Sequence, residues 1–436
     1  MPQISLAVVG AGDRGTRHAR FALEHPDRAR VVAVAEPRAV RRERFAAEHG
    51  LAAEDAVADW RELTSRGRRI ADAVLVCTLD RDHLEPVLAF AALGYHIMLE
   101  KPMALDEESC RAVVEAVEKA GVILSVGHVL RYTPYTQALK VLLGEGRIGD
   151  VVSVRHLEPV GFWHQAHSFV RGNWRRSDEA TTMLMAKSCH DLDWLQYVVG
   201  APPKRVSSFG RLSYFTAEHR PEGAADRCVE CPVRAQCSFD VVRFYGDRLA
   251  GGDHGWPLSV VVDDLTEEAL DTALRTGPYG RCVFACDNDV VDHQVVAMEF
   301  EGGATATFTM TGFTQIGHRR TEIFGTRGEV RGDGQLLHVH DFLTGTTESI
   351  GTSAVSAVGA MTAEGGHGGG DAGLMDAFVS AVAAGDPSLV RSGPRESLLS
   401  HLTVLAAERA RLERRVVELE AAAGDREIVR TPEALG

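Results

Sequence analysis

A glycine-rich segment near the start of the chain has the residue types and spacing of a nucleotide-binding turn. It reads Gly10-Ala11-Gly12-Asp13-Arg14-Gly15, follows an apolar run and opens a helical pattern. Gly10 permits a tight turn, Gly12 lets a pyrophosphate approach the main chain, and Gly15 lets helix and strand pack closely. A helix N-terminus also offers free N–H groups and a partial positive charge to phosphate. The segment therefore predicts a dinucleotide site.

Glu36 is the acidic residue expected to bind the ribose of that dinucleotide. It ends the second apolar run, 21 residues after Gly15. A carboxylate at this distance bonds the ribose hydroxyls and repels a 2′-phosphate, which favours NAD over NADP. Arg38 and Arg41 follow closely and could bind a 2′-phosphate, so NADP is the less favoured alternative.

Lys101 is the first candidate for proton chemistry. It follows a third apolar run, within Glu100-Lys101-Pro102. Removing a hydride from a carbinol carbon requires a base for the hydroxyl proton, or a cation that holds the developing alkoxide. A partly desolvated lysine can serve as either. The alternative is a surface lysine at a helix start, which the helix dipole disfavours.

His190 is the second candidate. Ser188 is expected to be the N-cap of a helix, which would place His190 in the first turn, where the helix N-terminus favours a neutral, proton-accepting imidazole. Asp193 is expected to orient this histidine or balance its charge. The alternative is a histidine packed on a buried helix face beside Trp194 and Tyr197.

Five of the eight cysteines are clustered. Cys228, Cys231 and Cys237 have the spacing C-x2-C-x5-C, and Cys282 and Cys286 follow about fifty residues later. In a reducing compartment such clustering predicts metal binding rather than disulfides. Four thiolates suit a closed, structural zinc site. We expect Cys228, Cys231, Cys237 and Cys282 to be the ligands, with Cys286 as the alternative fourth; a loop with free thiols is the other possibility.

The bulk properties limit the classes of function. The chain has 436 residues, 45% hydrophobic and 25% charged, which is typical of a soluble globular protein with two or three domains. Its net charge of −14 argues against nucleic acid and anionic membranes as partners. No run approaches the roughly 20 apolar residues that span a bilayer. The first apolar run is interpreted as a strand rather than a signal sequence, so a cytoplasmic location is expected.

The elements that position these residues alternate up to about residue 125. Strands are expected at 4–9, 31–35, 73–77, 95–99 and 122–126, and helices near 14–24, 38–48, 83–93 and 106–120. Apolar runs in this alternation predict a parallel sheet covered on both faces. Ligands of such sheets lie beyond the C-terminal strand ends, where Gly10, Glu36, Thr78 and Lys101 all fall.

The pattern changes after Pro134 to segments that indicate a largely antiparallel sheet with one covered face. Strands are expected at 150–158, 204–214, 293–300, 303–311, 320–325 and 336–341. Helices are expected at 188–199, near 371–384 and at 395–423. The predicted units are a dinucleotide-binding domain at 1–130, an α+β domain at 131–370 with a cysteine-rich insertion near 215–290, and packing helices at 371–436.

The chain resembles the Gfo/Idh/MocA oxidoreductases over nearly its whole length. The resemblance is carried by the glycine segment, by Thr78 with His83, by Glu100-Lys101-Pro102, by Arg131 with Pro134, and by His190 with Asp193. It implies an α/β fold with an N-terminal Rossmann sheet and a C-terminal domain with an open sheet. It also implies NAD(P)-dependent chemistry on a sugar or cyclitol hydroxyl, a catalytic role for Lys101, and a homodimer or homotetramer. Thr78, Leu79, His83 and Glu100 join the expected cofactor site.

The sequence departs from the family pattern beside His190. Most family dehydrogenases have an aspartate where this chain has Ala186, and Val129 replaces a common asparagine. Lys187 is expected to supply a cation near the substrate instead, or to be an exposed lysine before the helix. The departure keeps an NAD-dependent glycosidase, which oxidises its sugar transiently, as the alternative function. A cofactor-binding regulator without activity is the second alternative.

Aromatic side chains beside hydrogen-bond donors suit the apolar face and hydroxyls of a sugar. The tryptophans are alternatively packing residues, and the glycine-rich loop around His367 is either a lid or a linker. The residues expected to contact substrate are His128, Arg131, Trp163, His164, Arg171, Trp174 and His367.

Overall fold

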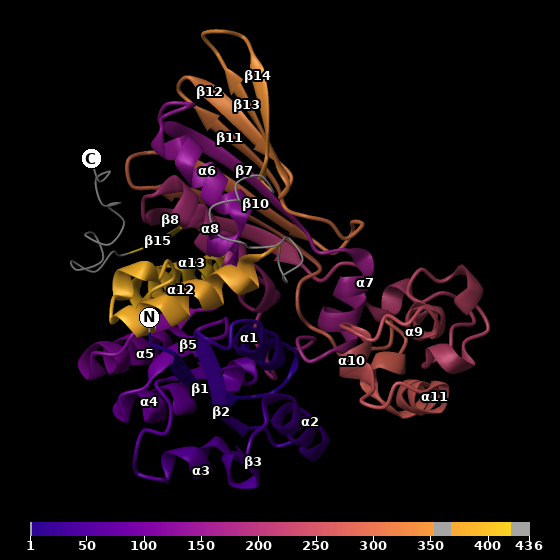
Figure 1. The fold of residues 1–436 in the computed structure, drawn as a ribbon. Coiled ribbons are helices and arrows are strands. Elements are labelled where there is room, and N and C mark those ends of the chain that lie inside the picture. Colours follow the sequence, from indigo (N-terminus) through magenta and orange to yellow (C-terminus); the bar gives the residue numbers. More distant parts are fainter. Residues whose placement is uncertain (1, 353–367, 420–436) are drawn as a thin grey trace.

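The computed structural model describes residues 2–352 and 368–419. Its N-terminal part holds six parallel strands in the order β3-β2-β1-β4-β5-β6 (Figure 1). The strands are β1 (Ile4–Val9), β2 (Ala29–Ala35), β3 (Ala56–Val57), β4 (Ala73–Val76), β5 (His96–Leu99) and β6 (Leu124–Val126). The predicted parallel sheet is confirmed, and β1 at its centre is followed directly by the glycine turn.

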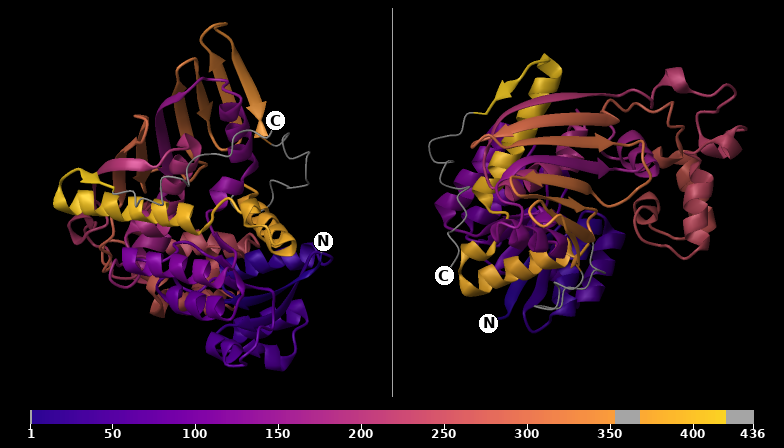
Figure 2. Two further views of the ribbon diagram at one scale, coloured as in Figure 1. Left: turned by 90° about the vertical axis from the view of Figure 1, so that its left-hand side faces the viewer. Right: turned by 90° about the horizontal axis from the view of Figure 1, so that it is seen from above.

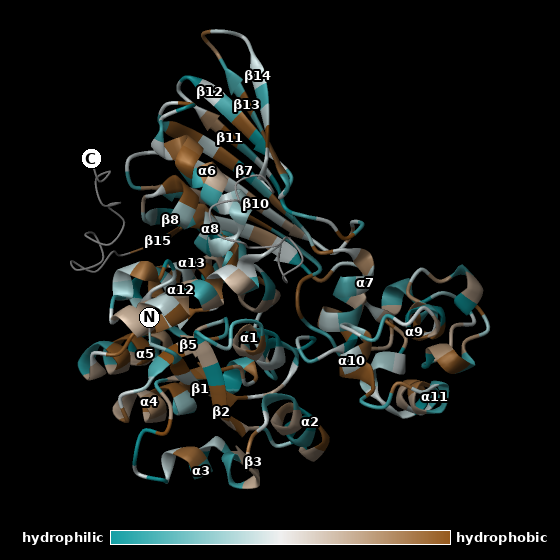
Figure 3. Ribbon diagram, in the orientation of Figure 1, coloured by the Kyte–Doolittle hydropathy of each residue, from teal (hydrophilic) through white to brown (hydrophobic). Residues whose placement is uncertain are grey.

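Helices cover both faces of this sheet because alternate side chains of each strand point to opposite sides. They are α1 (Asp13–Glu24), α2 (Ala39–His49), α3 (Trp60–Thr64), α4 (Leu84–Ala92) and α5 (Glu107–Ala120). Leu6 and Val8 of β1 belong to one buried cluster, which includes residues of α1, while Ala7 and Val9 belong to a second, which includes residues of α4 and α5. Figure 3 shows brown, apolar segments where these helices and strands meet.

The C-terminal part contains a nine-stranded sheet in the order β14-β13-β12-β11-β7-β10-β9-β8-β15. Its strands are β7 (Val151–Pro159), β8 (Pro203–Arg211), β9 (His293–Phe300), β10 (Thr305–Thr311), β11 (Arg320–Gly325), β12 (Gly328–Gly332), β13 (Leu336–Asp341), β14 (Thr347–Gly351) and β15 (Val417–Glu418). β7 and β10 are parallel, and the other neighbouring pairs are antiparallel. The predicted mostly antiparallel sheet is confirmed, with β12, β14 and β15 as strands that the sequence did not indicate.

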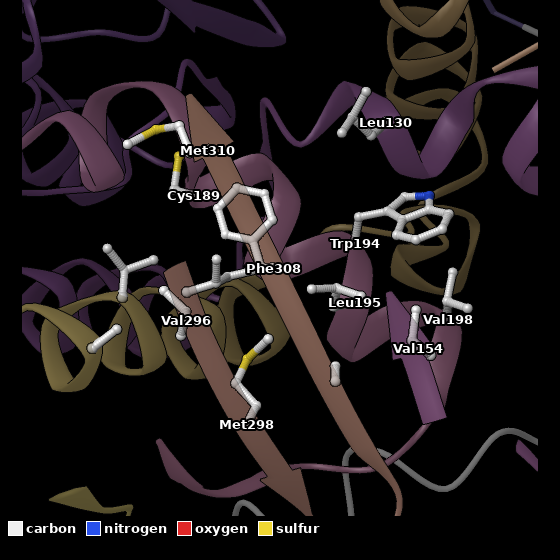
Figure 4. Close-up of a cluster of buried hydrophobic side chains, with 14 of the residues drawn as sticks. Leu130, Val154, Cys189, Trp194, Leu195, Val198, Val296, Met298, Phe308 and Met310 are labelled. Carbon is white, nitrogen blue, oxygen red and sulfur yellow. The ribbon is translucent and has the colours of Figure 1, made fainter. Parts of the chain in front are cut away.

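One face of this sheet packs against α6 (Pro134–Gly144), α8 (Met183–Val199) and α13 (Pro394–Glu413). Figure 4 shows Leu195 of α8 beside Phe308 of β10, and Cys189 of α8 beside Met310 of β10. Together with α12 (Gly370–Ala384), α13 lies between the two sheets (Figure 2). The C-terminal helices thus join the two halves of the molecule.

An insertion between β8 and β9 projects to one side of the body (Figures 1 and 2). It contains α9 (Val241–Ala250), α10 (Leu258–Val261) and α11 (Glu267–Thr276), and it has its own small core around Tyr245 and Leu270. It meets the body at α7 (Phe162–His164) and at a π-helical segment, η4 (Gln165–Arg171). Long π-helical segments are rare and often occur at functional sites.

The start of α8 corrects one prediction. Thr182, rather than Ser188, is the N-cap, and its hydroxyl accepts the N–H of Met185 at 3.4 Å. The good helix formers that follow Thr182 extend the helix before Ser188 is reached. His190 therefore lies about two turns into α8, and the argument from the helix N-terminus does not apply to it. The predicted last helix, 395–423, is also too long, since α13 ends at Glu413.

Over the parts of the chain that are described, no helix combines the length and apolar character needed to cross a membrane.

Candidate active site

The three glycines of the turn have different surroundings. A Cβ on Gly10, which has a φ of +90°, would stand 2.5 Å from the carbonyl oxygen of Cys77, and a Cβ on Gly15 would stand 1.9 Å from that of Gly10. A Cβ on Gly12 would meet only the guanidinium of Arg41, at 3.9 Å. Gly10 and Gly15 therefore serve close packing, whereas Gly12 leaves open space beside the first turn of α1, which no side chain caps. These features fit a pyrophosphate.

Glu36 is buried at the end of β2, directly beside this turn. One of its carboxylate oxygens accepts the N–H of Ala11 at 2.8 Å, and the other accepts the N–H of Arg38 at 3.0 Å. The carboxylate is therefore fixed at the edge of the open space next to Gly12. This is the position of the ribose-binding acid in dinucleotide sites.

Arg14 connects the glycine turn to two buried carboxylates. Its Nε donates to Glu100 at 2.7 Å, and its Nη2 donates to Asp371, in the first turn of α12, at 2.8 Å. His18 also contacts Glu100, at 2.7 Å. Burial alone would raise the pKa of Glu100, but Arg14, His18 and Lys101 outweigh it and hold this pKa well below the ordinary value. Glu100 is therefore a permanent anion beneath the site.

Lys101 reaches from the end of β5 across to α8. Its Nζ donates to the carbonyl oxygen of Ala186 at 2.7 Å, and its backbone N–H donates to Glu100 at 3.0 Å. The Lys101–Pro102 peptide is cis, and Nδ1 of His83 bonds the carbonyl oxygen of Pro102 at 2.7 Å. The ammonium is thus held at the C-terminal edge of the parallel sheet, beside the first turn of α8.

Three buried imidazoles lie together behind Lys101. The ring centroid of His128 is 5.9 Å from that of His190 and 5.4 Å from that of His401. Burial lowers the pKa of His128 to about 3 and that of His401 to about 4, so both are neutral near pH 7. Nε2 of His401 accepts the N–H of Met103 at 2.8 Å, which makes its Nδ1 the donor to Ser397. Within the described residues, no hydrogen-bond partner reaches either ring nitrogen of His128.

Arg131 and Asp193 form a buried ion pair next to these histidines. Nε and Nη2 of Arg131 each donate to one carboxylate oxygen of Asp193 at 2.8 Å. Burial would raise the pKa of Asp193, but Arg131 and His128 lower it. Oδ1 of Asp193 is 3.7 Å from Nε2 of His128. The role of Asp193 toward His190 stays a prediction, as does a direct contact of Arg131 with substrate.

Lys187 places a second cation near Lys101, one residue after Ala186. Its Nζ is 3.3 Å from Glu158 at the end of β7, and Glu158 also pairs with Arg319 at 3.1 Å. Burial, followed by the charge of Lys187, holds the pKa of His164 well below its ordinary value. Glu158 and Arg319 were not expected from the sequence, because their neighbours are far away along the chain.

This geometry agrees with the two family models that match the chain. Residues 4–128 match the model described as "Oxidoreductase family, NAD-binding Rossmann fold". Residues 140–419 match the model described as "Oxidoreductase family, C-terminal alpha/beta domain". The chain belongs to the Gfo/Idh/MocA oxidoreductase family. The glycine turn and Lys101 therefore lie in the part of the chain that matches the NAD-binding model.

Similar proteins are named for several reactions. The chain is 26% identical to the "Putative oxidoreductase YteT" of Bacillus subtilis, over 70% of this chain and 71% of that protein. It is 30% identical to the 2,7-anhydro-N-acetylneuraminate hydratase of Escherichia coli, over 48% of this chain and 52% of that protein. It is 29% identical to the scyllo-inositol 2-dehydrogenase (NAD(+)) of Bacillus subtilis, over 48% of this chain and 58% of that protein. The last two matches span little more than half of the relatives' lengths.

The fold is also that of solved structures in this group. An oxidoreductase domain protein from Kribbella flavida superposes with a TM-score of 0.71 at 20% identity, over 97% of this chain and 100% of that chain. At this identity the likeness concerns the fold alone.

Of the expected substrate residues, Arg171 and Trp163 contact the insertion, and Trp174 contacts the parallel-sheet part of the chain. Arg171, buried in η4, donates to the carbonyl oxygens of Arg281 and Phe239. Trp163 packs against Trp256, with ring centroids 5.4 Å apart, and Nε1 of Trp174 donates to Asp80 at 2.8 Å. Contact of Arg171, Trp163 and Trp174 with substrate stays a prediction, and His367 lies outside the described residues.

The remaining expected cofactor residues lie around the same sheet edge. Oγ1 of Thr78 donates to the carbonyl oxygen of Asp82 at 3.0 Å, and Leu79 is 56% exposed. Asp13 begins α1 and lies 3.6 Å from Arg17. Contact of these three residues with a cofactor stays a prediction.

The predicted zinc site is not supported. Sγ of Cys228 lies 3.7 Å from Arg171, that of Cys237 accepts the N–H of Phe239, and that of Cys286 donates to the carbonyl oxygen of Cys282. In the two described ranges, no group of three or more His, Cys, Asp or Glu side chains is arranged to hold a metal ion. The spacing C-x2-C also occurs in loops with free thiols, and here the thiols bond the neighbouring backbone and Arg171.

Proposed function

We propose that this chain is an NAD-dependent oxidoreductase that transfers a hydride between a nicotinamide cofactor and a hydroxyl of a sugar, sugar derivative or cyclitol. The observation that carries the proposal is the position of Lys101. Its ammonium lies at the C-terminal edge of the parallel sheet, 2.7 Å from the carbonyl oxygen of Ala186, with neutral His128 and His401 nearby. An ammonium and neutral imidazoles at one edge suit the transfer of a hydroxyl proton.

The cofactor would be held by groups that the fold already presents. The open space at Gly12 and the uncapped N-terminus of α1 suit its pyrophosphate, and the fixed carboxylate of Glu36 suits its ribose hydroxyls. When bound, NAD supplies the hydride acceptor. Because Glu36 would repel a 2′-phosphate, we expect NAD to bind more tightly than NADP.

The proton is handled by the chain's own side chains. Lys101 would bond the substrate oxygen and hold its negative charge as the proton leaves, as its bond to Ala186 fixes the direction of the ammonium. His190 is the expected proton acceptor. Lys187 would orient the substrate from the other side of Ala186, with Glu158 holding its Nζ in place.

A substrate panel tests this function. The purified chain is mixed with NAD and a set of aldoses, sugar acids and cyclitols, and absorbance at 340 nm is followed. We expect net NADH formation with at least one sugar or cyclitol. NAD binding without NADH formation across the panel, together with no reduction of the corresponding keto sugars by NADH, would contradict the proposal.

A second candidate is a reaction without net oxidation, in which the sugar is oxidised transiently, a group is eliminated, and the cofactor is restored. The relative named as an anhydro-sugar hydratase and the alanine at position 186 favour it. An NAD-dependent glycosidase of this type would cleave an aryl glycoside without a lasting change at 340 nm. It would also exchange a sugar C–H with deuterium from the solvent, which a simple dehydrogenase would not do.

The outer face of the nine-stranded sheet suits a second copy of the chain in a homodimer or homotetramer. Apolar side chains stand exposed on it, with Phe209 of β8 opposite Val295 of β9. The same sheet carries a hollow of about 500 Å³ lined by residues such as Arg155, Arg320 and Arg331. Light scattering of the purified chain would give the oligomeric state, and a monomer would contradict the proposal.

A further inference from the structure

The insertion contacts the cofactor half of the molecule through one ion pair beside the glycine turn. Nε and Nη2 of Arg41, on α2, each lie 3.3 Å from Oδ1 of Asp263, which follows α10. The side chain of Arg41 is only 15% exposed, whereas that of Asp263 is 44% exposed. An acidic residue of the insertion therefore fixes a largely buried guanidinium of the parallel-sheet unit.

That guanidinium lies over the open space of the turn. Its Nη1 is 3.9 Å from where a Cβ on Gly12 would stand. Glu36, which bonds Ala11 of the same turn, ends the strand that precedes α2. Arg41 is thus placed near the ribose side of the expected dinucleotide, where a cation would attract an additional phosphate group.

Tyr279 of the insertion lies within electrostatic reach of the same region. Burial raises the pKa of Tyr279, and the nearby positive charges of Arg38, Arg175 and Arg41 oppose this effect. The insertion thus brings an aromatic side chain, as well as a carboxylate, near the arginines of this region.

We propose that Asp263 is a cofactor-specificity residue. The ion pair neutralises the guanidinium of Arg41 and holds it away from the position of a 2′-phosphate, which it would otherwise bind. Asp263 thereby strengthens the preference for NAD over NADP that Glu36 creates. The insertion then helps to select NAD against NADP. This inference rests on the proposed function only in that the chain binds a nicotinamide dinucleotide.

The test measures dissociation constants for NADH and NADPH by fluorescence titration at low ionic strength. In Asp263→Asn, the dissociation constant for NADPH should fall about two- to fivefold, which is the effect expected from the interaction energy of one exposed ion pair. The dissociation constant for NADH should stay the same. Asp264→Asn is the matched control, because it removes the same charge from the adjacent exposed residue, for which no bond to Arg41 is found in the described structure. It should leave both constants unchanged.

A double variant locates the effect. Adding Arg41→Gln to Asp263→Asn should abolish the gain in NADPH affinity, because the gain requires the released guanidinium. An equal gain for both dinucleotides, no gain, or a gain that survives Arg41→Gln would overturn the inference. If the parent chain binds dinucleotide but oxidises no sugar, the proposed reaction fails and this test still decides the role of Asp263. If it binds neither dinucleotide, both proposals fail.

Discussion

The guanidinium of Arg14, in the glycine turn, lies 2.7 Å from the carboxylate of Glu100, the residue that precedes Lys101. The same carboxylate accepts the backbone N–H of Lys101 through its other oxygen. One buried anion therefore connects the turn proposed to hold the pyrophosphate with the lysine proposed to act in proton transfer. Loss of the Arg14 guanidinium should therefore weaken the support of Lys101 through Glu100, without any direct contact with substrate.

Removing the guanidinium tests this connection. In Arg14→Ala, Glu100 and Asp371 lose their common cation, and breaking a buried ion pair by removing one partner typically costs about 3–5 kcal/mol. We expect a loss of about 3 kcal/mol in the free energy of unfolding, since His18 still contacts Glu100. Urea unfolding followed by circular dichroism measures it. Arg20→Ala, which removes an exposed arginine paired with Glu24 on α1, should cost below about 0.5 kcal/mol; equal losses in the two variants would contradict the connection.

Lys101→Met should reduce turnover while preserving cofactor binding. Loss of a proton-handling group costs about 10²- to 10⁴-fold in rate, whereas the groups expected to hold the dinucleotide lie at Gly12 and Glu36. We therefore expect a turnover at least about 100-fold lower, with a dissociation constant for NADH within about twofold of the parent. Lys119→Met, at the exposed end of α5, is the control and should leave both unchanged. Full turnover in Lys101→Met would remove Lys101 from the reaction.

The sequence predicted the parallel sheet well because its strands are short apolar runs that end at glycine or at polar residues. The run before Gly10 and the run before Glu36 each became a strand, and their shared edge followed from parallel pairing. β12 was missed because its sequence, Gly328–Gly332, contains two glycines and two charged residues. Such a strand is defined by its neighbours rather than by its own composition.

The site was predicted less completely because its supporting groups come from distant parts of the chain. His401 bonds Met103, about three hundred residues away, and Arg319 bonds Asp191 and Glu158. No local pattern marks a histidine in the middle of α13 as part of a site. Ser188 was mistaken for a helix cap because serine is a common cap, although Thr182 caps α8.

Gly12 and Gly15 should respond differently to alanine. A Cβ on Gly12 has open space, so Gly12→Ala should change the free energy of unfolding by less than about 1 kcal/mol. The same Cβ stands where a pyrophosphate would approach, so it should weaken NADH binding by about tenfold or more. In Gly15→Ala the Cβ would stand 1.9 Å from the carbonyl oxygen of Gly10, so the backbone must shift, at a cost of about 1–3 kcal/mol. Thermal melts and NADH titrations separate the two effects. Unchanged NADH affinity in Gly12→Ala would contradict the position assigned to the pyrophosphate.

The buried histidines should make stability depend on pH in a defined window. His128 and His401 have a pKa of about 3 and about 4 in the folded chain, against roughly 6.5 when unfolded. Between about pH 6.5 and pH 4 the unfolded chain binds protons that the folded chain does not, so the free energy of unfolding falls as the pH is lowered, by at most about 1.4 kcal/mol per unit for each histidine. Urea unfolding at several pH values measures this slope. His401→Gln should make the slope shallower, whereas His254→Gln, at an exposed position, should not. Parallel curves for the parent and His401→Gln would show that the pKa of His401 is the same in the folded and unfolded chain, and would contradict the prediction.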